Sequence, residues 1–256
     1  MCTLVVLHRV HPAWPAIFAA NRDEFYARPT EAPQVLIESP RVVGGRDVLA
    51  GGTWMAVNAA GFFVGLTNQA PEGAIEGARR SRGEVVLEAA RAGSVTAAEA
   101  WLRALRPGAC NPFNLIYGDA GRLRLLYARD HGHTFVDVPA GVHVLPNDVL
   151  DSSRFPKVNR ALTLIGEPPP GEDALLACLY AVLGDSAPPD PVPSAPGPAD
   201  VQVRAALHAL CVRTPLYGTR SASVVALAPG RVARFTHAEG PPDRAPFVDL
   251  TALVTG

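Results

Sequence analysis

Prolines and glycines interrupt this chain so often that it has room only for short secondary-structure elements. The 256 residues include 25 Pro and 23 Gly. No apolar run approaches the roughly 18 residues of a membrane-spanning helix. Hydrophobic residues make up 48% of the sequence and charged residues 18%, which is typical of a globular protein. The length is sufficient for one domain, residues 1–256, with a sizeable core.

The chain begins with predicted strands. Residues 2–8 and 16–21 are short apolar runs separated by two prolines, a pattern that indicates two buried strands with a tight connection. After a stretch that we expect to be irregular, residues 53–58 and 62–67 flank Ala-Ala-Gly and indicate a hairpin. The sequence therefore places a sheet at the start of the fold.

Helices and further strands follow. Ser81 and Glu84 have the spacing of a helix capping box, and Thr96 and Glu99 repeat it, so we expect a pair of helices. Turn residues then divide a predicted β-meander at 113–117, 122–128, 134–138 and 142–145. Helical patterns lie at 158–165, 173–183 and 201–212, and a final hairpin at 221–228 and 231–236.

The order of these elements predicts an α+β fold. Strands at both ends of the chain enclose the helix pairs, which favours one domain with sheets covered by helices. A proline-rich segment at 186–199 separates two of the helical patterns, and we interpret it as a surface loop.

Charge and cysteine content exclude several classes of protein. The net charge of -1 provides no overall basic field, so we expect no nucleic-acid partner. The four cysteines form no C-x-x-C pair, and the start of the chain does not resemble a signal peptide, which favours the cytoplasm. Of the 23 basic residues only Lys157 is a lysine, a bias that suggests a G+C-rich bacterial source. Lys157 completes no phosphate-binding G-K-[ST] motif.

Cys2 is the first candidate for chemistry. Removal of Met1 would give it a free α-amino group, and this amine has a reference pKa near that of a thiol, so it can act as the base for the nucleophile. The alternative is an ordinary buried cysteine at the start of a strand.

Four polar residues, 21–24, directly follow the second apolar run. Because side chains alternate along a strand, Asn21 and Asp23 should face one way and Arg22 and Glu24 the other. One pair would then meet the Cys2 thiol. The alternative is a solvated turn with an internal ion pair.

Nine sequence features, in order along the chain, carry a resemblance to a known family. They are Cys2, Asn21-Arg22-Asp23-Glu24, Gly51-Gly52-Thr53-Trp54, Leu66-Thr67-Asn68, Ser81-Arg82-Gly83, Asn111-Pro112-Phe113-Asn114-Leu115, His143-Val144-Leu145-Pro146-Asn147, Pro156-Lys157-Val158 and Tyr217-Gly218-Thr219-Arg220-Ser221. Together they resemble the NRDE family, also called the transport and Golgi organisation protein 2 family. The resemblance extends from residue 2 to about residue 235.

The resemblance implies a fold and a set of site residues. The family is similar to the N-terminal nucleophile (Ntn) hydrolases, whose fold is a four-layer αββα sandwich, and within them to the penicillin V acylase and bile salt hydrolase group. By this analogy the catalytic residues are Cys2, Arg22, Asp23, Asn68, Asn147 and Arg220. The analogous enzymes space their Arg and Asp differently, so Asn21 or Glu24 is the alternative for those positions. We expect Asn21, Glu24 and Trp54 to contact the substrate.

The resemblance also implies a rival function. Family members have been linked to haem mobilisation and to binding acyl-coenzyme A, so a non-catalytic carrier with the same pocket is the alternative to a hydrolase of a linear amide or related acyl bond. Axial haem ligands would come from His8, His11, His131, His133 or His143, which show no closed metal-binding spacing. We therefore expect a small-molecule ligand, no metal and no resident cofactor, with haem as the alternative ligand.

Overall fold

The strands form two antiparallel sheets. The computed structural model describes residues 3–70, 79–189, 191–192 and 201–256. In spatial order, the first sheet contains β10 (Gly141–Leu145), β1 (Thr3–His8), β2 (Ala16–Phe25), β11 (Tyr217–Ala228), β12 (Arg231–Ala238) and β13 (Val248–Asp249). The second sheet contains β3 (Thr30–Ile37), β4 (Val42–Asp47), β5 (Met55–Asn58), β6 (Phe62–Asn68), β7 (Phe113–Gly118), β8 (Leu123–Arg129) and β9 (Gly132–Asp137).

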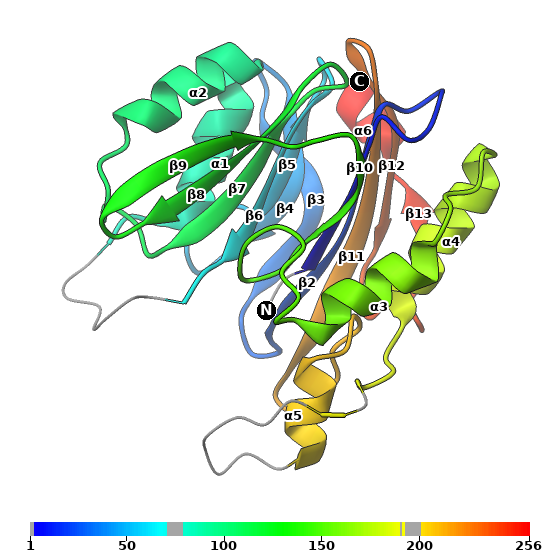
Figure 1. The fold of residues 1–256 in the computed structure, drawn as a ribbon. Coiled ribbons are helices and arrows are strands. Elements are labelled where there is room, and N and C mark those ends of the chain that lie inside the picture. Colours follow the sequence, from blue (N-terminus) through cyan, green and yellow to red (C-terminus); the bar gives the residue numbers. More distant parts are fainter. Residues whose placement is uncertain (1–2, 71–78, 190, 193–200) are drawn as a thin grey trace.

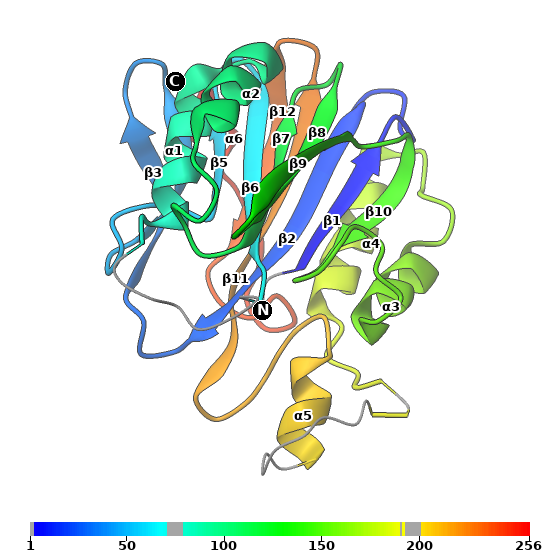
Figure 2. The same cartoon turned by 60° about the vertical axis from the view of Figure 1, so that its left-hand side comes forward.

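Helices cover the outer face of each sheet. The helices are α1 (Arg82–Ala92), α2 (Val95–Ala104), α3 (Pro156–Ile165), α4 (Glu172–Gly184), α5 (Val201–Leu207) and α6 (Thr251–Thr255). Buried residues of α1 and α2 pack on the second sheet, and those of α3 and α4 pack on the first. Figures 1 and 2 show these helix pairs on opposite sides of the stacked sheets. The predicted four-layer αββα sandwich is confirmed.

The apolar core between the sheets fixes which way each strand faces. Phe18 of β2 stacks on Phe63 of β6, with ring centroids 3.7 Å apart, and both are fully buried. The alternate β2 residues Ile17 and Ala19 pack instead on the helix side of the first sheet. This alternation continues to the polar end of β2 and determines where its site residues point.

The predicted hairpin and first helix are confirmed in outline. β5 pairs with β6, and Gly61 takes the left-handed φ of 77° that the turn requires. Ser81 caps α1 by accepting from the backbone N–H of Gly83 at 3.2 Å. The Glu84 carboxylate, expected to complete a capping box, instead accepts from Arg80 at 2.9 Å.

The second helix begins at a different cap from the one predicted. Ser94, and not Thr96, accepts a hydrogen bond from the Ala97 backbone at 3.3 Å and precedes the first turn. Both residues belong to the preferred N-cap types, and the capping-box spacing to Glu99, which favoured Thr96, does not mark the cap that forms. The last predicted helix, 201–212, is also shorter and ends at Leu207.

The stretch expected to be irregular contains β3 and β4. Pro33 interrupts the β3 pattern, but β3 lies at the edge of its sheet and its register shifts between Glu31 and Gln34, so the missing N–H is tolerated. In β4, only a glycine fits at position 44, because a Cβ on Gly44 would lie 2.4 Å from the Met55 carbonyl oxygen. Neither strand therefore shows a simple apolar alternation.

The predicted β-meander of four strands contains only three. β7, β8 and β9 are consecutive in the second sheet, but β10 pairs with β1 in the first. Pro139 lies in the connection where the chain crosses between the sheets, and Gly141, which has a φ of 142°, begins β10. The crossing brings the residues after β10 to the end of the sandwich where β6 ends.

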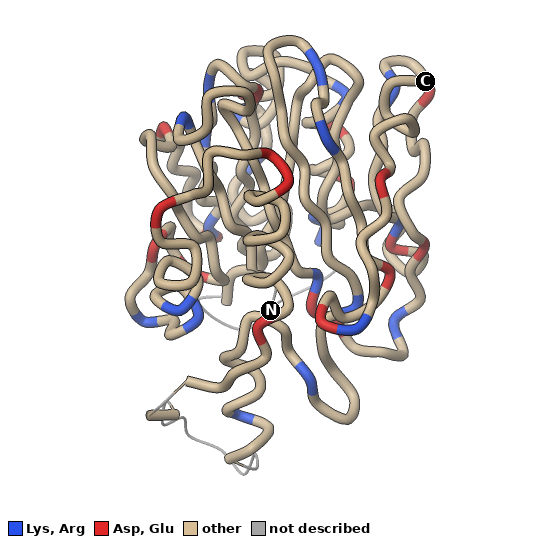
Figure 3. Tube along the Cα trace, turned by 90° about the vertical axis from the view of Figure 1, so that its right-hand side faces the viewer, with Lys and Arg blue, Asp and Glu red and all other residues tan. Residues whose placement is uncertain are grey.

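Two sequence predictions concern the rest of the chain. The proline-rich loop at 186–199 lies largely outside the described residues. Among the helices that the structure describes, none has the length and apolar character that crossing a membrane requires. Figure 3 shows basic and acidic residues interspersed along the trace, in keeping with the net charge of -1.

Candidate active site

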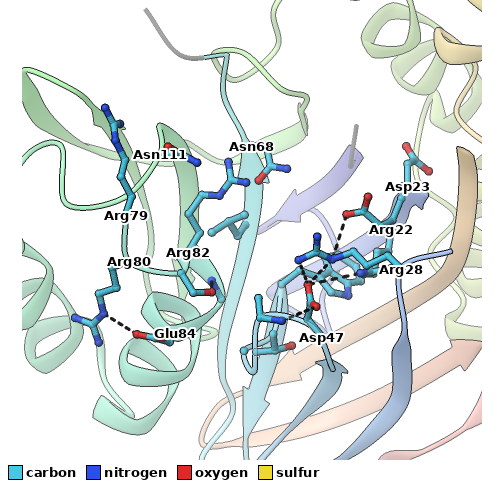
Figure 4. Close-up of a pocket in the computed structure, with 18 residues that line it drawn as sticks. Arg22, Asp23, Arg28, Asp47, Asn68, Arg79, Arg80, Arg82, Glu84 and Asn111 are labelled. Carbon is cyan, nitrogen blue, oxygen red and sulfur yellow. Dashed lines mark hydrogen bonds and ion pairs between the residues drawn. The ribbon is translucent and has the colours of Figure 1, made fainter. Parts of the chain in front are cut away.

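The largest polar cavity near the predicted site residues lies at one end of the sandwich, where β2 and β6 end and α1 begins (Figure 4). Its volume is about 520 Å³. Residues of five segments line it: 22–28 at the end of β2, 47–54 from the end of β4, 66–68 in β6, 79–84 at the start of α1, and Asn111 before β7. We call this space the main cavity. Its lining includes five arginines and four carboxylates.

Arg22 and Asp23 point to opposite faces of β2, as the strand alternation predicts. Arg22 lies on the side facing the second sheet, and its Nη2 is 3.9 Å from the Asp47 carboxylate. Asp23 accepts a hydrogen bond from the Thr219 hydroxyl at 2.6 Å. Both are buried, with 6% and 3% of their surface exposed. They are therefore not one internal ion pair.

Burial governs the charge of Asp23. Desolvation raises the pKa of its carboxyl above the usual range, while the Lys157 ammonium and the Thr219 hydrogen bond lower it. Lys157 is itself buried in the first turn of α3, with 1% of its surface exposed. The buried Lys157 side chain therefore adds positive charge to the surroundings of the buried Asp23 carboxyl.

The turn after β2 carries an ion cluster. Arg28 donates to Asp47 through Nε at 2.9 Å and approaches it through Nη2 at 2.8 Å, with Glu24 3.8 Å from Nε. Asp47 also accepts from the backbone N–H groups of Leu49 and Ala50, each at 3.1 Å. The carboxylate therefore fixes both its own loop and the guanidinium at the cavity wall.

A second wall is formed by the start of α1. A Cβ on Gly52 would meet the Gly83 backbone at 2.4 Å, so the loop before β5 packs directly on the first turn of the helix. Arg79 pairs with Asp130 at 2.5 Å, and Arg82 donates to the Pro112 carbonyl at 3.4 Å. These contacts place guanidinium groups along one side of the cavity.

Asn68 and Asn147 come together from different sheets. The Asn147 amide donates to the Asn68 carbonyl at 2.8 Å. The loop after β10 is held there because Thr67 donates to the Pro146 carbonyl at 2.8 Å and Asn114 to the Asp148 carbonyl at 2.7 Å. Asn68 lines the main cavity, whereas Asn147 is not among the lining residues and reaches the site through this hydrogen bond.

The structure places five of the nine predicted site residues at the main cavity. They are Arg22, Asp23, Glu24, Trp54 and Asn68. Cys2 lies outside the described residues. The catalytic and binding roles assigned to all nine remain predictions.

Asn21 and Arg220 do not line the main cavity. The fully buried Asn21 amide donates to the Leu183 and Leu210 carbonyls at 2.8 and 2.9 Å, which ties β2 to the end of α4 and to the segment before β11. Arg220 donates to three backbone carbonyls between residues 25 and 28, at 2.8 to 3.1 Å. In this structure the contacts of both residues hold the backbone that carries the site.

None of the histidines that the structure describes lines the main cavity. His8 donates from Nδ1 to the Val138 carbonyl at 3.0 Å, and His11 from Nε2 to the Pro170 carbonyl at 2.9 Å. His143 pairs with Asp151 at 2.7 Å, while His131 lies in the β8–β9 turn and His133 in β9. Within the described ranges, no three metal-ligating side chains are grouped to hold an ion.

Sequence reasoning missed Arg28, Asp47 and Thr219. Asp47 and Arg28 flank the two strands that were taken as irregular, so nothing placed them beside β2. Thr219 was quoted in a motif but given no role, because its pairing with Asp23 depends on the β2–β11 register. A usable signal was present in Arg79-Arg80-Ser81-Arg82, three arginines around a helix cap.

Solved structures share this architecture. An N-acylethanolamine-hydrolyzing acid amidase ortholog from Caenorhabditis elegans matches with a TM-score of 0.54 and 12% identity, over 90% of this chain and 93% of that one. A variant of conjugated bile acid hydrolase from Clostridium perfringens matches with a TM-score of 0.53 and 13% identity, over 99% and 94%. The fold is therefore that of the Ntn hydrolases.

Sequence relatives identify the family. The Transport and Golgi organization protein 2 homolog of Bos taurus is 32% identical over 227 residues, which cover 83% of this chain and 82% of that protein. The Homo sapiens homolog is 28% identical over 233 residues, with the same coverage. The family described as Transport and Golgi organisation 2 matches residues 1–238. The chain belongs to this family, which confirms the expectation from the sequence.

Proposed function

We propose that this protein is a cysteine-dependent Ntn-type hydrolase that cleaves a linear amide or related acyl bond in the main cavity. One observation carries the proposal: Arg22, Asp23 and Asn68 line one cavity at the end of β2. Thr3, the first described residue, pairs with Asn21 at this same end. Cys2 precedes Thr3 in the chain and is the proposed nucleophile.

In the proposed reaction, each of these residues has a separate role. After loss of Met1, the α-amine of Cys2 would accept the thiol proton, the thiolate would attack the acyl carbon, and the amine would return the proton to the leaving group. Water would then hydrolyse the thioester and free the thiol. Asp23 would orient the ammonium form of the amine, whose positive charge would favour the carboxylate against the burial that raises its pKa. The Asn68 amide would donate to the oxyanion. Arg22 would hold negative charge in the substrate.

The remaining cysteines support Cys2 as the reactive thiol. Burial raises the pKa values of Cys110, Cys178 and Cys211, so their thiolate fractions at neutral pH are small. We expect a limiting thiol-directed acylating probe to label Cys2 first, with intact mass also reporting the loss of Met1. Cys2→Ala should abolish labelling and turnover of amide substrates, while the matched Cys178→Ala should change neither.

Two results would contradict the hydrolase. One is equal labelling of wild type and Cys2→Ala, and the other is an intact Met1 on the folded protein. Asp23→Asn gives a further check, because it keeps the shape and removes the charge. It should lower turnover at least tenfold, the smallest loss expected if Asp23 orients the base.

The second candidate function is a non-catalytic carrier. The arginines of the main cavity favour acyl-coenzyme A as its ligand. The phosphates of an acyl-coenzyme A would match guanidinium groups at 79–82. None of the described histidines, which the sequence offered as axial ligands of haem, lines this cavity. If a long-chain acyl-coenzyme A binds saturably to wild type and to Cys2→Ala, and neither protein turns over an acyl substrate, the carrier hypothesis is supported and the hydrolase hypothesis is wrong. In either case we propose a bacterial, cytoplasmic protein with a small-molecule ligand, no nucleic-acid partner and no resident cofactor.

A further inference from the structure

A second, smaller cavity lies behind the main one, between the two sheets. Its volume is about 20 Å³, enough for about one water molecule. Arg22 and Trp54 line both cavities, so these two side chains form the wall between them. The far side of the small cavity is lined by Ser221, Ser223 and His237.

Ser223, His237 and Glu239 form a hydrogen-bonded chain at this cavity. Ser223 of β11 and His237 of β12 are register partners, with Oγ and Nδ1 2.8 Å apart. The other ring nitrogen, Nε2, is 3.1 Å from the Glu239 carboxylate. Ser223 and His237 are buried, whereas 62% of the Glu239 side chain is exposed. The chain therefore connects the interior to solvent.

The chemistry of the partners fixes the proton positions. An ionised carboxylate can only accept, so neutral His237 donates from Nε2 to Glu239 and accepts at Nδ1 from the Ser223 hydroxyl. The Ser223 oxygen then keeps lone pairs that can accept a hydrogen bond from the cavity. When His237 takes up a proton, Nδ1 becomes a donor to Ser223, and the hydroxyl hydrogen must turn away from the ring.

We propose that His237 is a proton-binding residue that positions Arg22 in the wall between the two cavities. With neutral His237, the Ser223 oxygen offers an acceptor on the side where Arg22 offers only donors. Protonation of His237 occupies one lone pair of the Ser223 oxygen, turns the hydroxyl hydrogen away from the ring and adds a positive charge to the small cavity. These changes drive the guanidinium toward Asp47, which lies 3.9 Å away at the main cavity. The role holds whether or not the main cavity hydrolyses a bond.

The charges around His237 determine when it switches. Arg22 from β2, Arg46 from β4, Glu31 from β3 and Glu239 line the small cavity with His237. By the sign of their charges, the two arginines should oppose protonation of the ring and the two carboxylates should favour it. Burial lowers the pKa of His237 below the ordinary histidine value, and Glu239 works against that shift. Protonation of the ring therefore requires a more acidic solution than protonation of an ordinary histidine.

Linkage makes the effect reciprocal. If protonation sends Arg22 toward the main cavity, an anion bound there draws Arg22 the same way and must raise the pKa of His237. Acid should therefore strengthen binding of an anion to the main cavity beyond what the anion's own titration explains.

Nuclear magnetic resonance of the histidine ring protons tests the coupling directly, with His237→Gln used to assign the signal. Arg22→Met should raise the midpoint of the His237 titration, because it removes a positive charge. Glu239→Gln should lower it, because it removes the solvent-exposed carboxylate. In wild type, the Arg22 Nε resonance should shift with the same midpoint, and this shift should vanish in His237→Gln.

Trp54 provides an optical readout of the same event, since it lines both cavities. The other tryptophans are first replaced by phenylalanine, because Trp14 lies 5.3 Å from His11 and would report that histidine instead. Emission from Trp54 should follow the His237 midpoint. The proposal is overturned if folded Arg22→Met leaves that midpoint unchanged. Should Arg22→Met not fold, an Arg22 Nε signal that is independent of pH in wild type overturns it.

Discussion

The two sheets of this fold are assembled in different ways. All seven strands of the second sheet occur in chain order, from β3 to β9, and each pairs with its neighbour in sequence. The first sheet joins three distant parts of the chain, because β1 and β2 pair with β10 on one side and with β11 on the other. The second sheet is thus made by local connections and the first by long-range ones.

The candidate site lies where the two kinds of assembly meet. Arg22 and Asp23 are carried by β2, at the centre of the long-range sheet, while Asn68 ends a strand of the local sheet. The main cavity exists only when both sheets are stacked. We therefore expect the main cavity to form late in folding. Pairing strands that are far apart in the chain costs more conformational entropy than pairing neighbours, so such pairing is slow.

The contact that joins the sheets should have the largest effect on stability. Phe18→Ala and Phe63→Ala each remove one ring of a fully buried stacked pair, and each should lower the free energy of unfolding by about 3–5 kcal/mol. The double variant should lose less than the sum, because the two rings share one contact. Urea unfolding followed by tryptophan emission and circular dichroism measures both effects.

The same experiment tests whether the sheets are separable. We expect the two probes to give one coincident transition in every variant, because neither sheet can cover its inner face alone. Two transitions, with only one moved by Phe18→Ala, would mean that the sheets unfold independently and that the comparison describes two domains.

The next largest effect on stability should come from two buried asparagines, one in each sheet. Asn21 in the first sheet donates to carbonyls 162 and 189 residues away, whereas Asn58 in the second donates to the Ala90 carbonyl and accepts from the Phe62 N–H nearby. Replacing either by Ala leaves backbone groups unsatisfied and should cost about 1–3 kcal/mol.

The kinetics of these variants should differ. Local contacts of the β5–β6 hairpin and α1 form early, so Asn58→Ala should slow refolding. The Asn21 contacts form last, so Asn21→Ala should mainly accelerate unfolding. Stopped-flow measurements of the refolding and unfolding rates in urea test this difference. If both variants change the two rates to the same extent, the proposed order of assembly is wrong.

The same contrast explains what the sequence could predict. The local elements were recognisable because each leaves a signature within a few residues, such as Ser81 before α1 or Gly61 in the hairpin turn. The fold class followed from their order and from the family resemblance. The alternation along β2 correctly separated Arg22 from Asp23.

Long-range consequences were not readable from the sequence. β10 was taken as a fourth meander strand, because nothing local reveals that it pairs with β1. No pattern shows that the Asn21 amide reaches two distant carbonyls near α4, or that the Arg220 guanidinium donates to three carbonyls of the turn after β2. The roles assigned to both residues stay predictions. Residues whose partners lie more than 150 positions away need the structure.

The smallest expected effect is an opposite pH dependence of two histidines, one in each sheet. His143 of β10 hydrogen-bonds Asp151, which raises the pKa of the imidazole, whereas burial lowers the pKa of His133 in β9. The raised pKa of His143 contributes stability that is fully present below the unfolded value of about 6.5 and is lost as pH rises through the folded one. For His133 the unfolded chain binds the proton better, so stability falls as pH drops below about 6.5.

Substitutions separate the two contributions. Asp151→Asn should reduce stability at pH 6 more than at pH 8, by less than about 1 kcal/mol because the pair is partly exposed. His133→Gln should do the reverse and raise stability at pH 5 relative to pH 8, since it removes a group that resists protonation only when folded. Thermal melts of both variants at these pH values make the measurement. A loss in Asp151→Asn that is independent of pH would mean that the carboxylate acts only through its 2.7 Å bond to the Val144 N–H, as a backbone brace for β10 without any charge pairing.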